Sequence, residues 1–288
     1  MRDSMAGTSV VTLNKNRRPH LLRLLEGLAR EGASPDECVV IEMGEDEGPL
    51  PAFPFPVTRR SLRRDGLPLA AARNAGRDAA RGDNLVFLDV DCIPSESLVP
   101  RLGGLLASHD ALICCAIRYL PAGAVRDGWS EAELRRAGQL HPVRNFPEEG
   151  VAEESNAGLF WSLAFAVRAA TFDRIGGFDE GFTGYGAEDT DFSFRAREAG
   201  IPLLFAGGTC AYHQHHDGYD PPLQHFDDII ANARRFRARH GFWPMDGWLD
   251  AFAARGLIAA DRRQDIDILR RPTAAEMEAA RLPADRVF

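Results

Sequence analysis

Two aspartates, Asp89 and Asp91, stand at the end of an apolar stretch that has the length of a buried strand. Residues 84–88 read Asn-Leu-Val-Phe-Leu, and Pro94 closes the segment. A strand that is buried on both faces has such a near-continuous apolar sequence. Burying an unpaired carboxylate in the surrounding hydrophobic core would cost a large amount of free energy. We therefore expect both aspartates at the carboxyl end of the strand, where open α/β sheets bind their ligands.

The one-residue spacing of Asp89 and Asp91 lets both side chains serve one ligand, because alternate residues of an extended chain point the same way. Hard carboxylate oxygens suit Mg²⁺ or Mn²⁺ that bridges to phosphates. A solvated turn after a strand would explain the same pair. Asp-x-Asp is also a common sequence, so the pair needs support from the rest of the chain.

A second acidic cluster, Glu188, Asp189 and Asp191, begins a helix that we predict over residues 188–199. Acids at this position also stabilise a helix through its dipole, so a structural explanation is available. Asp191 can pair with Arg195 at i+4, and we interpret it as mainly structural. The preceding residues 181–186 contain three glycines and two aromatics, which predicts a flexible, aromatic-lined approach.

The stretch Tyr-His-Gln-His-His at residues 212–216 supplies imidazoles directly after a predicted strand. His213 and His215 would share a side-chain direction if the chain stays extended. A surface cluster that binds no metal is the alternative. Because imidazole is a poor ligand for Mg²⁺, a site here favours Mn²⁺ or a mixed set of donors.

These groups need an α/β scaffold to position them, and the hydrophobic pattern predicts one. Strand patterns and helix patterns alternate through most of the chain, as in parallel crossover units. Residues 121–154 carry one short amphipathic helix, at 130–137, but no firm strand signal, and we interpret them as a candidate lid. The expected strands are 8–13, 38–43, 57–62, 84–91, 111–120, 163–168, 203–205 and 209–212. The other expected helices are 21–32, 68–81, 95–108, 169–175, 188–199 and 222–240.

Composition limits the class of protein. The chain has 288 residues, a hydrophobic fraction of 45% and a net charge of −8, which gives no electrostatic case for a nucleic-acid partner. Its five cysteines lack a Cys-x-x-Cys pair and mostly lie in apolar runs, which indicates buried thiols in a reducing compartment. We find no signal core and no run long enough to span a membrane, and we expect a cytoplasmic protein. Peripheral membrane contact and a homodimer are left open.

Taken together, the motifs resemble those of GT-A fold glycosyltransferases, both bacterial family-2 enzymes and the C-terminal half of the β-1,4-galactosyltransferases. The latter carry an Asp-Val-Asp followed by Ile-Pro, a Gly-Gly-Phe turn, a Gly-x-Glu-Asp-x-Asp helix start and a later histidine. This chain has all four in the same order, at residues 89–94, 176–178, 186–191 and 213. The resemblance covers roughly residues 8–216. It implies an inverting, metal-dependent transfer of a hexose or N-acetylhexosamine from a nucleotide-diphosphate sugar, with UDP as the expected carrier.

The resemblance also implies roles for particular residues. Asp189 would be the general base, with Glu188 on acceptor or sugar hydroxyls. Asp91 and His213, with His215 as the fallback, would hold Mn²⁺ or Mg²⁺. Acceptor contacts are expected from Trp161, Tyr185 and Gly186, although core packing would also explain Trp161. The expected nucleotide-sugar contacts are Thr12, Asn14, Arg17, Glu42, Arg73, Asn74, Asp89 and Val90.

Two departures from the resembling enzymes matter. Their second strand usually ends in an aspartate that contacts the base, whereas this one ends in Glu42 and Met43. The aromatic before Gly-x-Glu-Asp is Trp in the galactosyltransferases and Tyr185 here, which leaves the sugar and acceptor preference open. The acceptor could be a saccharide, a lipid-linked molecule or a small molecule.

We expect a GT-A domain over residues 1–243, with a nucleotide-binding half at 8–110 and an acceptor and catalytic half at 111–243. A helical extension would occupy 244–288. A nucleotidyltransferase of similar fold is one alternative, but it should carry a glycine-rich loop where this chain has Asn-Lys-Asn-Arg-Arg at residues 14–18. A non-catalytic sugar-nucleotide or carbohydrate-binding protein is the other, and it would have no need of a base.

Overall fold

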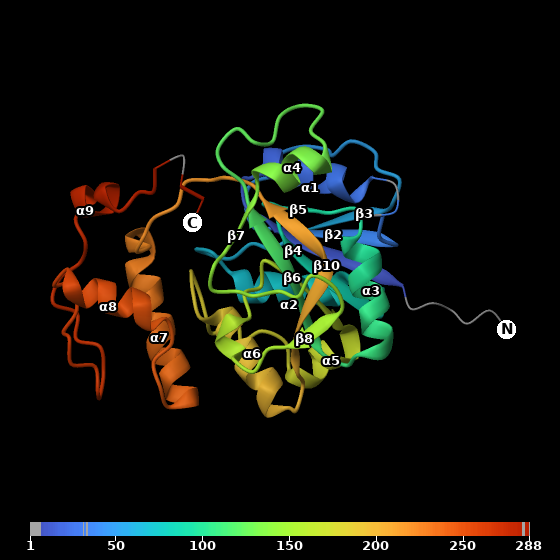
Figure 1. Ribbon diagram of the computed structural model, residues 1–288. Helices are drawn as coiled ribbons and strands as arrows, with labels where there is room; N and C mark the ends of the chain where they lie inside the picture. Colours follow the sequence, from blue (N-terminus) through green and yellow to red (C-terminus); the bar gives the residue numbers. More distant parts are fainter. Residues whose placement is uncertain (1–6, 31, 33, 284–285, 288) are drawn as a thin grey trace.

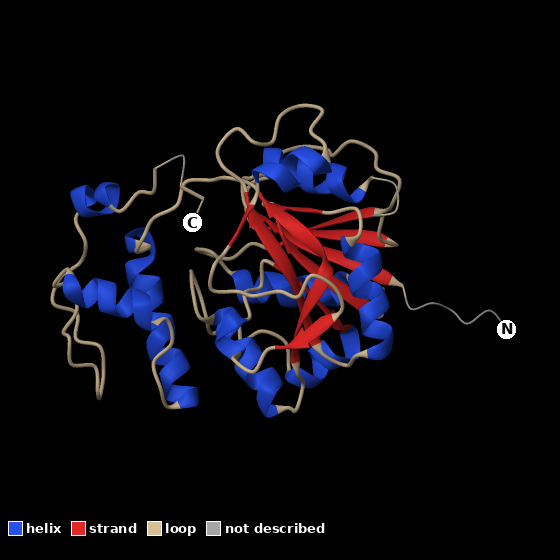
Figure 2. Cartoon of the chain, viewed as in Figure 1, coloured by secondary structure: helices blue, strands red, loops and turns tan. Residues whose placement is uncertain are grey.

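The computed structural model describes residues 7–30, 32, 34–283 and 286–287. The outermost residues of the expected domain ranges, 1–6 and 288, therefore lie outside the described part of the chain. A central sheet flanked by helices makes up the larger body, and a helical unit stands beside it (Figures 1 and 2).

The N-terminal half of the sheet is parallel, with the strand order β3-β2-β1-β4. Its strands carry the expected buried apolar runs, and the crossovers are mostly helical. Leu13 of β1 aligns with Ile41 of β2 and with Asp89 of β4, so the carboxyl ends of three strands meet at one edge. The elements of this half are β1 (Thr8–Asn14), α1 (Arg18–Leu28), β2 (Glu37–Glu42), β3 (Val57–Ser61), α2 (Leu69–Ala79) and β4 (Asn84–Asp89).

The second half of the sheet is mixed. Strand β9 runs antiparallel between β4 and β6, β6 and β10 are parallel, and β5 closes the edge antiparallel to β10. The expected strands at 203–205 and 209–212 form one strand, β10, with an irregularity between Ala206 and Cys210, where Gly207, Gly208 and Thr209 stand opposite the single step from Cys115 to Ala116 of β6. The elements here are β5 (Cys92–Pro94), α3 (Leu98–Ser108), β6 (Leu112–Tyr119), β9 (Ala164–Arg168), α5 (Ala169–Ile175), α6 (Glu188–Glu198) and β10 (Leu203–His213).

Residues 121–154 contain more structure than their sequence predicted. Besides the expected helix they form two short strands, of two and three residues, which are too short to show a periodic pattern. One pairs with β6 and the other with β10. The elements are α4 (Glu131–Ala137), β7 (Gln139–Leu140) and β8 (Val151–Glu153), and the single turn η1 (Ala157–Leu159) follows.

The sheet buries a hydrophobic core on each face. One contains the leucines of α1 and α3, and the other contains apolar side chains of α2, α5 and α6. All five cysteines are buried and free. Burial raises the pKa of Cys38 to about 12 and that of Cys114 to about 11, so these thiols are unreactive.

A separate core lies in the C-terminal part of the chain and runs from Leu223 to Ala280. It joins η2 (Leu223–His225) and α7 (Phe226–His240) to α8 (Asp246–Ala254), and Met277 of α9 (Ala274–Ala279) packs against it. We call residues 223–282 the C-terminal unit. Residue 243, the boundary that we expected, lies between two parts of this core, because Ile229 and Ile230 of α7 pack in it together with Leu249 of α8. Figure 1 shows α7 and α8 next to each other.

Candidate active site

The turn after β4 brings Asp91 to the end of β10. Strand β4 ends at Asp89, and β5 starts at Cys92, which pairs with His213. The carbonyl oxygen of Asp91 accepts a 2.7 Å hydrogen bond from the backbone N–H of Gln214. This pairing holds the acidic turn beside the histidine-rich segment that follows β10.

Asp91, His213 and His216 form a group that could hold a metal ion. One ligand atom from each lies within 4.8 Å of the others. His213 Nε2 is 3.5 Å from Asp91 Oδ1, and His216 Nε2 is 3.4 Å from Asp91 Oδ2. One carboxylate with two imidazoles is a donor set for a borderline cation such as Mn²⁺, so these residues fit the metal that the sequence led us to expect.

The charges around this group favour metal binding. Burial opposes ionisation of Asp91, but attraction to His213, His216 and Arg17 holds the pKa of its carboxyl well below the ordinary value. Burial lowers the pKa of His213 to about 4, so its imidazole is neutral and able to ligate near pH 7. Arg17, at the start of α1, places Nη1 2.6 Å from Asp91 Oδ2 and neutralises this carboxylate.

His215, our fallback ligand, does not belong to this group, and His216 takes its place. The prediction assumed that the chain stays extended beyond His213, so that alternate side chains keep one direction. Strand β10 instead ends at His213, and the following residues leave the sheet with Gln214 bonded to Asp91. The two-residue rule of a strand does not apply past that point.

The second acidic cluster meets the first through Arg73 of α2. This guanidinium is buried, with Nη1 3.1 Å from Glu188 and Nη2 3.4 Å from Asp89. Burial raises the pKa of Asp89 to about 6 and that of Glu188 to about 7, in spite of the attraction to Arg73. Acids that are far apart in the sequence therefore share one site, and two of them are poised near neutral pH.

Asp189 lies beside Glu188 at the start of α6. Its Oδ2 is 3.5 Å from the backbone N–H of Ser162, and its Oδ1 accepts a 2.7 Å bond from the N–H of Thr190. The side chain is only partly buried. A partly exposed carboxylate beside Glu188 is available to a substrate hydroxyl.

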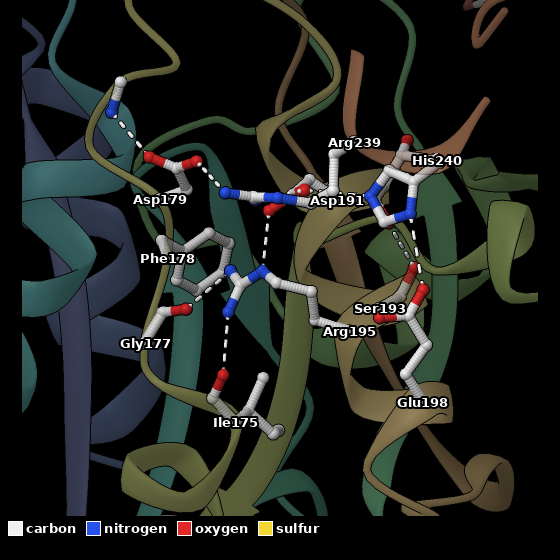
Figure 3. A network of polar contacts seen from close by, with 12 residues as sticks. Ile175, Gly177, Phe178, Asp179, Asp191, Ser193, Arg195, Glu198, Arg239 and His240 are labelled. Atoms are coloured by element: carbon white, nitrogen blue, oxygen red, sulfur yellow. Dashed lines mark hydrogen bonds and ion pairs between the residues drawn. The ribbon is translucent and has the colours of Figure 1, made fainter. Parts of the chain in front are cut away.

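Asp191 has the structural role that we expected. It is fully buried and accepts hydrogen bonds from Arg195 Nε at 2.8 Å and from Arg239 Nη1 at 2.7 Å. His240 Nε2 lies 3.0 Å from the same carboxylate. Arg239 also reaches Asp179, so the start of α6 is tied to α7 as well as to its own helix (Figure 3).

The residues expected at the nucleotide differ in how available they are. Asn14 is buried, and its amide donates to Glu42 at 2.7 Å. Glu42 also accepts a 3.0 Å bond from Arg59. Thr12 is fully buried, and its hydroxyl has no partner in the described part of the chain. The Asn14 side chain also accepts a 3.1 Å hydrogen bond from the backbone N–H of Arg17.

Two further expected contacts are engaged elsewhere. Asn74 donates 2.9 Å and 3.0 Å bonds to the Phe178 carbonyl and the Glu180 carboxylate, and it accepts one from the Phe178 N–H. Its side chain thus braces the turn before α6. The side chain of Val90 packs into the core, so this side chain is not available to a ligand.

Tyr185 and Gly186 contact the C-terminal unit. The ring of Tyr185 stacks on His225 at 4.5 Å and on Trp248 at 5.8 Å between centroids. Burial, followed by the nearby carboxylates of Glu188 and Asp189, raises the pKa of Tyr185, so its hydroxyl remains a hydrogen-bond donor. The C-terminal unit therefore contributes to the wall of the site.

The loop at residues 181–186 is closely packed, although we expected it to be flexible. The Asn232 amide of α7 donates to the carbonyls of Thr183, Tyr185 and Gly186 at 2.9, 3.3 and 2.9 Å. A Cβ on Gly184 would lie 2.1 Å from the Asp228 carboxylate, and both Gly184 and Gly186 have positive φ. The glycines serve close approach to the C-terminal unit rather than mobility.

The other acceptor candidate, Trp161, is partly buried and packs edge-on against His141 at 4.9 Å. The sequence did not point to His216 as a ligand, nor to Asn232, His225 and Trp248. His216 stood in the histidine stretch and could have been proposed. The other three carry no local signal, because their role depends on how the C-terminal unit packs.

Comparisons with known proteins bear on the family and the fold. Residues 9–176, more than half of the chain, match glycosyl transferase family 2. The chain belongs to this family. Residues 152–217 of this family-2 protein also match the N-terminal domain of galactosyltransferase, and they include Asp189, Glu188 and His213.

Among curated relatives, validoxylamine A glucosyltransferase from Streptomyces hygroscopicus subsp. limoneus is 27% identical over 260 residues, covering 81% of this chain and 56% of the relative. Pre-mycofactocin glycosyltransferase from Mycobacterium tuberculosis is 32% identical over 149 residues, covering 51% of this chain and 30% of the relative. The family-2 chain thus spans about half the length of the first of these relatives and about a third of the second.

Solved structures share the fold. GalNAc-T7 with UDP, GalNAc and Mn²⁺ aligns with a TM-score of 0.54 at 17% identity, covering 88% of this chain and 58% of that one. Residues 1–349 of S. aureus TarS in complex with UDP align with a TM-score of 0.55 at 15% identity, covering 86% and 72%. The GT-A fold that we expected is confirmed. Among the described residues, no helix is long and apolar enough to cross a membrane.

Proposed function

We propose that the chain transfers a hexose or N-acetylhexosamine from a UDP-sugar to an acceptor hydroxyl, with inversion at the anomeric carbon. The observation that carries the proposal is the buried Arg73, which contacts Asp89 of the β4 edge and Glu188 of α6 and so joins both acidic clusters in one site. Family membership supports a glycosyl transfer over the nucleotidyltransferase alternative. The UDP-bound structures of the same fold support a nucleotide-sugar donor.

Asp91, His213 and His216 would hold Mn²⁺, or Mg²⁺, on the diphosphate side of this site. A divalent ion there supplies Lewis-acid neutralisation of the negative charge that grows on the leaving diphosphate. Arg17 is the cation of this chain that already lies beside Asp91, and its partly exposed guanidinium can turn to a phosphate oxygen.

Asp189 takes the proton of the attacking hydroxyl in this proposal. The acceptor oxygen forms its bond to the anomeric carbon while the bond from that carbon to the phosphate oxygen breaks and UDP leaves with the electron pair. The proton passes to the Asp189 carboxylate, which is partly exposed at the start of α6. Glu188, oriented by Arg73, is placed to hydrogen-bond sugar or acceptor hydroxyls.

The test uses Asp189→Asn with a panel of UDP-sugars and Mn²⁺. We expect a loss of at least 100-fold in UDP release, the usual scale for removing a general base, because Asn cannot accept the proton. UDP with Mn²⁺ should still raise the melting temperature of the variant as it does for the parent protein. Transfer at close to the parental rate would refute the role of Asp189. No response of the parent protein to any UDP-sugar would refute the proposed donor.

A further inference from the structure

Arg144 is a buried cation that the proposed function does not use. It lies in the loop between β7 and β8, and only 5% of the residue is exposed. Its guanidinium carbon is 4.9, 5.0 and 5.1 Å from the ring centres of Phe146, Trp161 and Phe205. Nε and Nη2 are buried without a hydrogen-bond partner, and none of the ion pairs found among the described residues involves Arg144.

Without a bound ligand, burial of the Arg144 guanidinium destabilises the folded protein. Contacts with aromatic rings return part of the cost of burying a guanidinium, but they do not satisfy its N–H groups. The nearby Cys114 thiol is a weak and neutral acceptor, since burial raises its pKa to about 11. Buried polar groups left without partners are rare and call for a specific explanation.

The unsatisfied guanidinium lines a small cavity. Its walls are Ile117, Tyr119, Leu140, His141, Arg144 and Phe146. The space holds about one water molecule, so a sugar ring does not fit into it, whereas an oxygen of a carboxylate or phosphate does. Leu140 on the wall is 47% exposed and nearby Val143 is 54% exposed, so the rim offers apolar surface to solvent.

The cavity lies between the two functional ends of the proposed site. On one side, the Trp161 ring is 5.0 Å from the Arg144 guanidinium, and the next residue, Ser162, contacts Asp189 at 3.5 Å. On the other side, the ring of Tyr119 is 5.1 Å from His213. A molecule anchored at Arg144 could therefore extend one of its hydroxyls toward Asp189.

We propose that Arg144 binds an oxyanion, a carboxylate or a phosphate, that is carried by the acceptor. This assignment rests on the proposed function, because it places the anion on the Asp189 side of the transfer. In the proposed function, the cationic partners of the donor diphosphate are Arg17 and the metal ion that Asp91, His213 and His216 would hold. Arg144 is then left for the second substrate. The acceptor class is then an anionic hydroxyl compound rather than a neutral saccharide.

The experiment compares Arg144→Gln with Arg126→Gln, which removes an exposed arginine of the same segment whose side chain donates a hydrogen bond to the Gly123 carbonyl of its own turn. Melting temperatures are measured in acetate or inorganic phosphate against chloride at equal ionic strength, without metal. We expect both anions to raise the melting temperature of the parent protein and of Arg126→Gln by more than 1 °C over chloride. The increment should be smaller in Arg144→Gln, by more than 1 °C, than in Arg126→Gln, which retains any general effect of these anions on protein stability. Arg144→Met, which keeps the contacts with the aromatic rings, replaces Arg144→Gln if the latter does not fold.

Equal increments in the parent protein and the Arg144 variant, or no increment in the parent protein, would overturn the site. A second series adds UDP and Mn²⁺ without the other anions. Retention of the UDP response in the Arg144 variant supports the acceptor as the source of the anion, and its loss would assign the anion to the donor and overturn our assignment. Failure of the parent protein to respond to UDP counts against the proposed function alone, since the anion series uses neither UDP nor metal.

Discussion

Asn232 offers a direct test of whether the C-terminal unit shapes the active site. Replacing it with alanine removes the amide that donates to three carbonyls of the loop at 183–186, at 2.9, 3.3 and 2.9 Å. The amide has two hydrogens, so two good bonds and a weaker shared one are lost. At about 1 kcal/mol net for each good bond, we expect unfolding to become easier by about 2 kcal/mol. For a chain of this size that is a fall of about 4–8 °C in melting temperature.

Activity should fall by more than this stability loss explains. The loop ends two residues before Glu188, so carbonyls released at Tyr185 and Gly186 loosen the start of α6. Small misplacements of catalytic groups can cost about 100-fold in rate. We expect at least a tenfold lower kcat for Mn²⁺-dependent UDP release from a UDP-sugar, measured well below the melting temperature of the variant.

The control is Thr273→Ala in the same C-terminal unit. Thr273 caps α9 through a capping box with Glu276, and its hydrogen bonds among the described residues all lie within α9 and its cap, so its loss should cost about 1 kcal/mol of stability with little effect on rate. An Asn232→Ala protein that turns over as fast as Thr273→Ala would refute the reasoning. In that case the hydrogen bonds would hold the C-terminal unit in place without positioning α6.

Three other predictions follow from the same contacts. The fold raises the pKa of Glu188 from 4.5 to about 7, so ionisation of this carboxyl opposes folding. The free energy of unfolding of the parent protein, relative to that of Glu188→Gln, should therefore fall between pH 4.5 and pH 7. Urea denaturation of both proteins at pH 4.5 and pH 8 measures this difference. A pH-independent difference would contradict this. Asp191→Asn removes a fully buried carboxylate from the partly exposed Arg195 and the exposed Arg239 and should lower the free energy of unfolding by about 2 kcal/mol, the scale of hydrogen bonds to a charged group, while a change below about 1 kcal/mol in the same assay would count against the Asp191 network. His213→Ala should abolish the rise in melting temperature that Mn²⁺ gives in the presence of UDP, and His215→Ala should keep it. The opposite pattern would favour the fallback ligand, His215, over His213.

The elements near the sheet were predictable because their signals are local. The apolar run before Asp89 and the alternation of strand and helix patterns placed the acidic turn at the carboxyl edge, and the i+4 spacing correctly paired Asp191 with Arg195. The pairing of β5 with β10 is a long-range contact without a pattern of its own. It is this pairing that brings His213 to Asp91.

The features that the sequence did not reveal depend on tertiary packing. The local sequence does not distinguish Arg144 from an exposed loop arginine. Its burial against Phe146 and Trp161 is a property of the tertiary structure. His216 replaced His215 because strand geometry stops at the last paired residue. The three glycines of the loop at 181–186 suggested a flexible loop. Only the position of α7 shows that Gly184 faces the Asp228 carboxylate.

This close packing of glycines has a consequence for the design of chimeric enzymes. The loop at 181–186 lies in close contact with side chains of the C-terminal unit: a Cβ on Gly181, Gly184 or Gly186 would come within 2.1 Å of Arg235, 2.1 Å of Asp228 or 2.9 Å of Met245. A graft that exchanges only the helices beyond residue 222 would carry foreign side chains into three tight contacts at once. Chimeras designed for new acceptors should exchange the loop at 181–186 together with the helices beyond residue 222. Each glycine then keeps the side chain that it packs against.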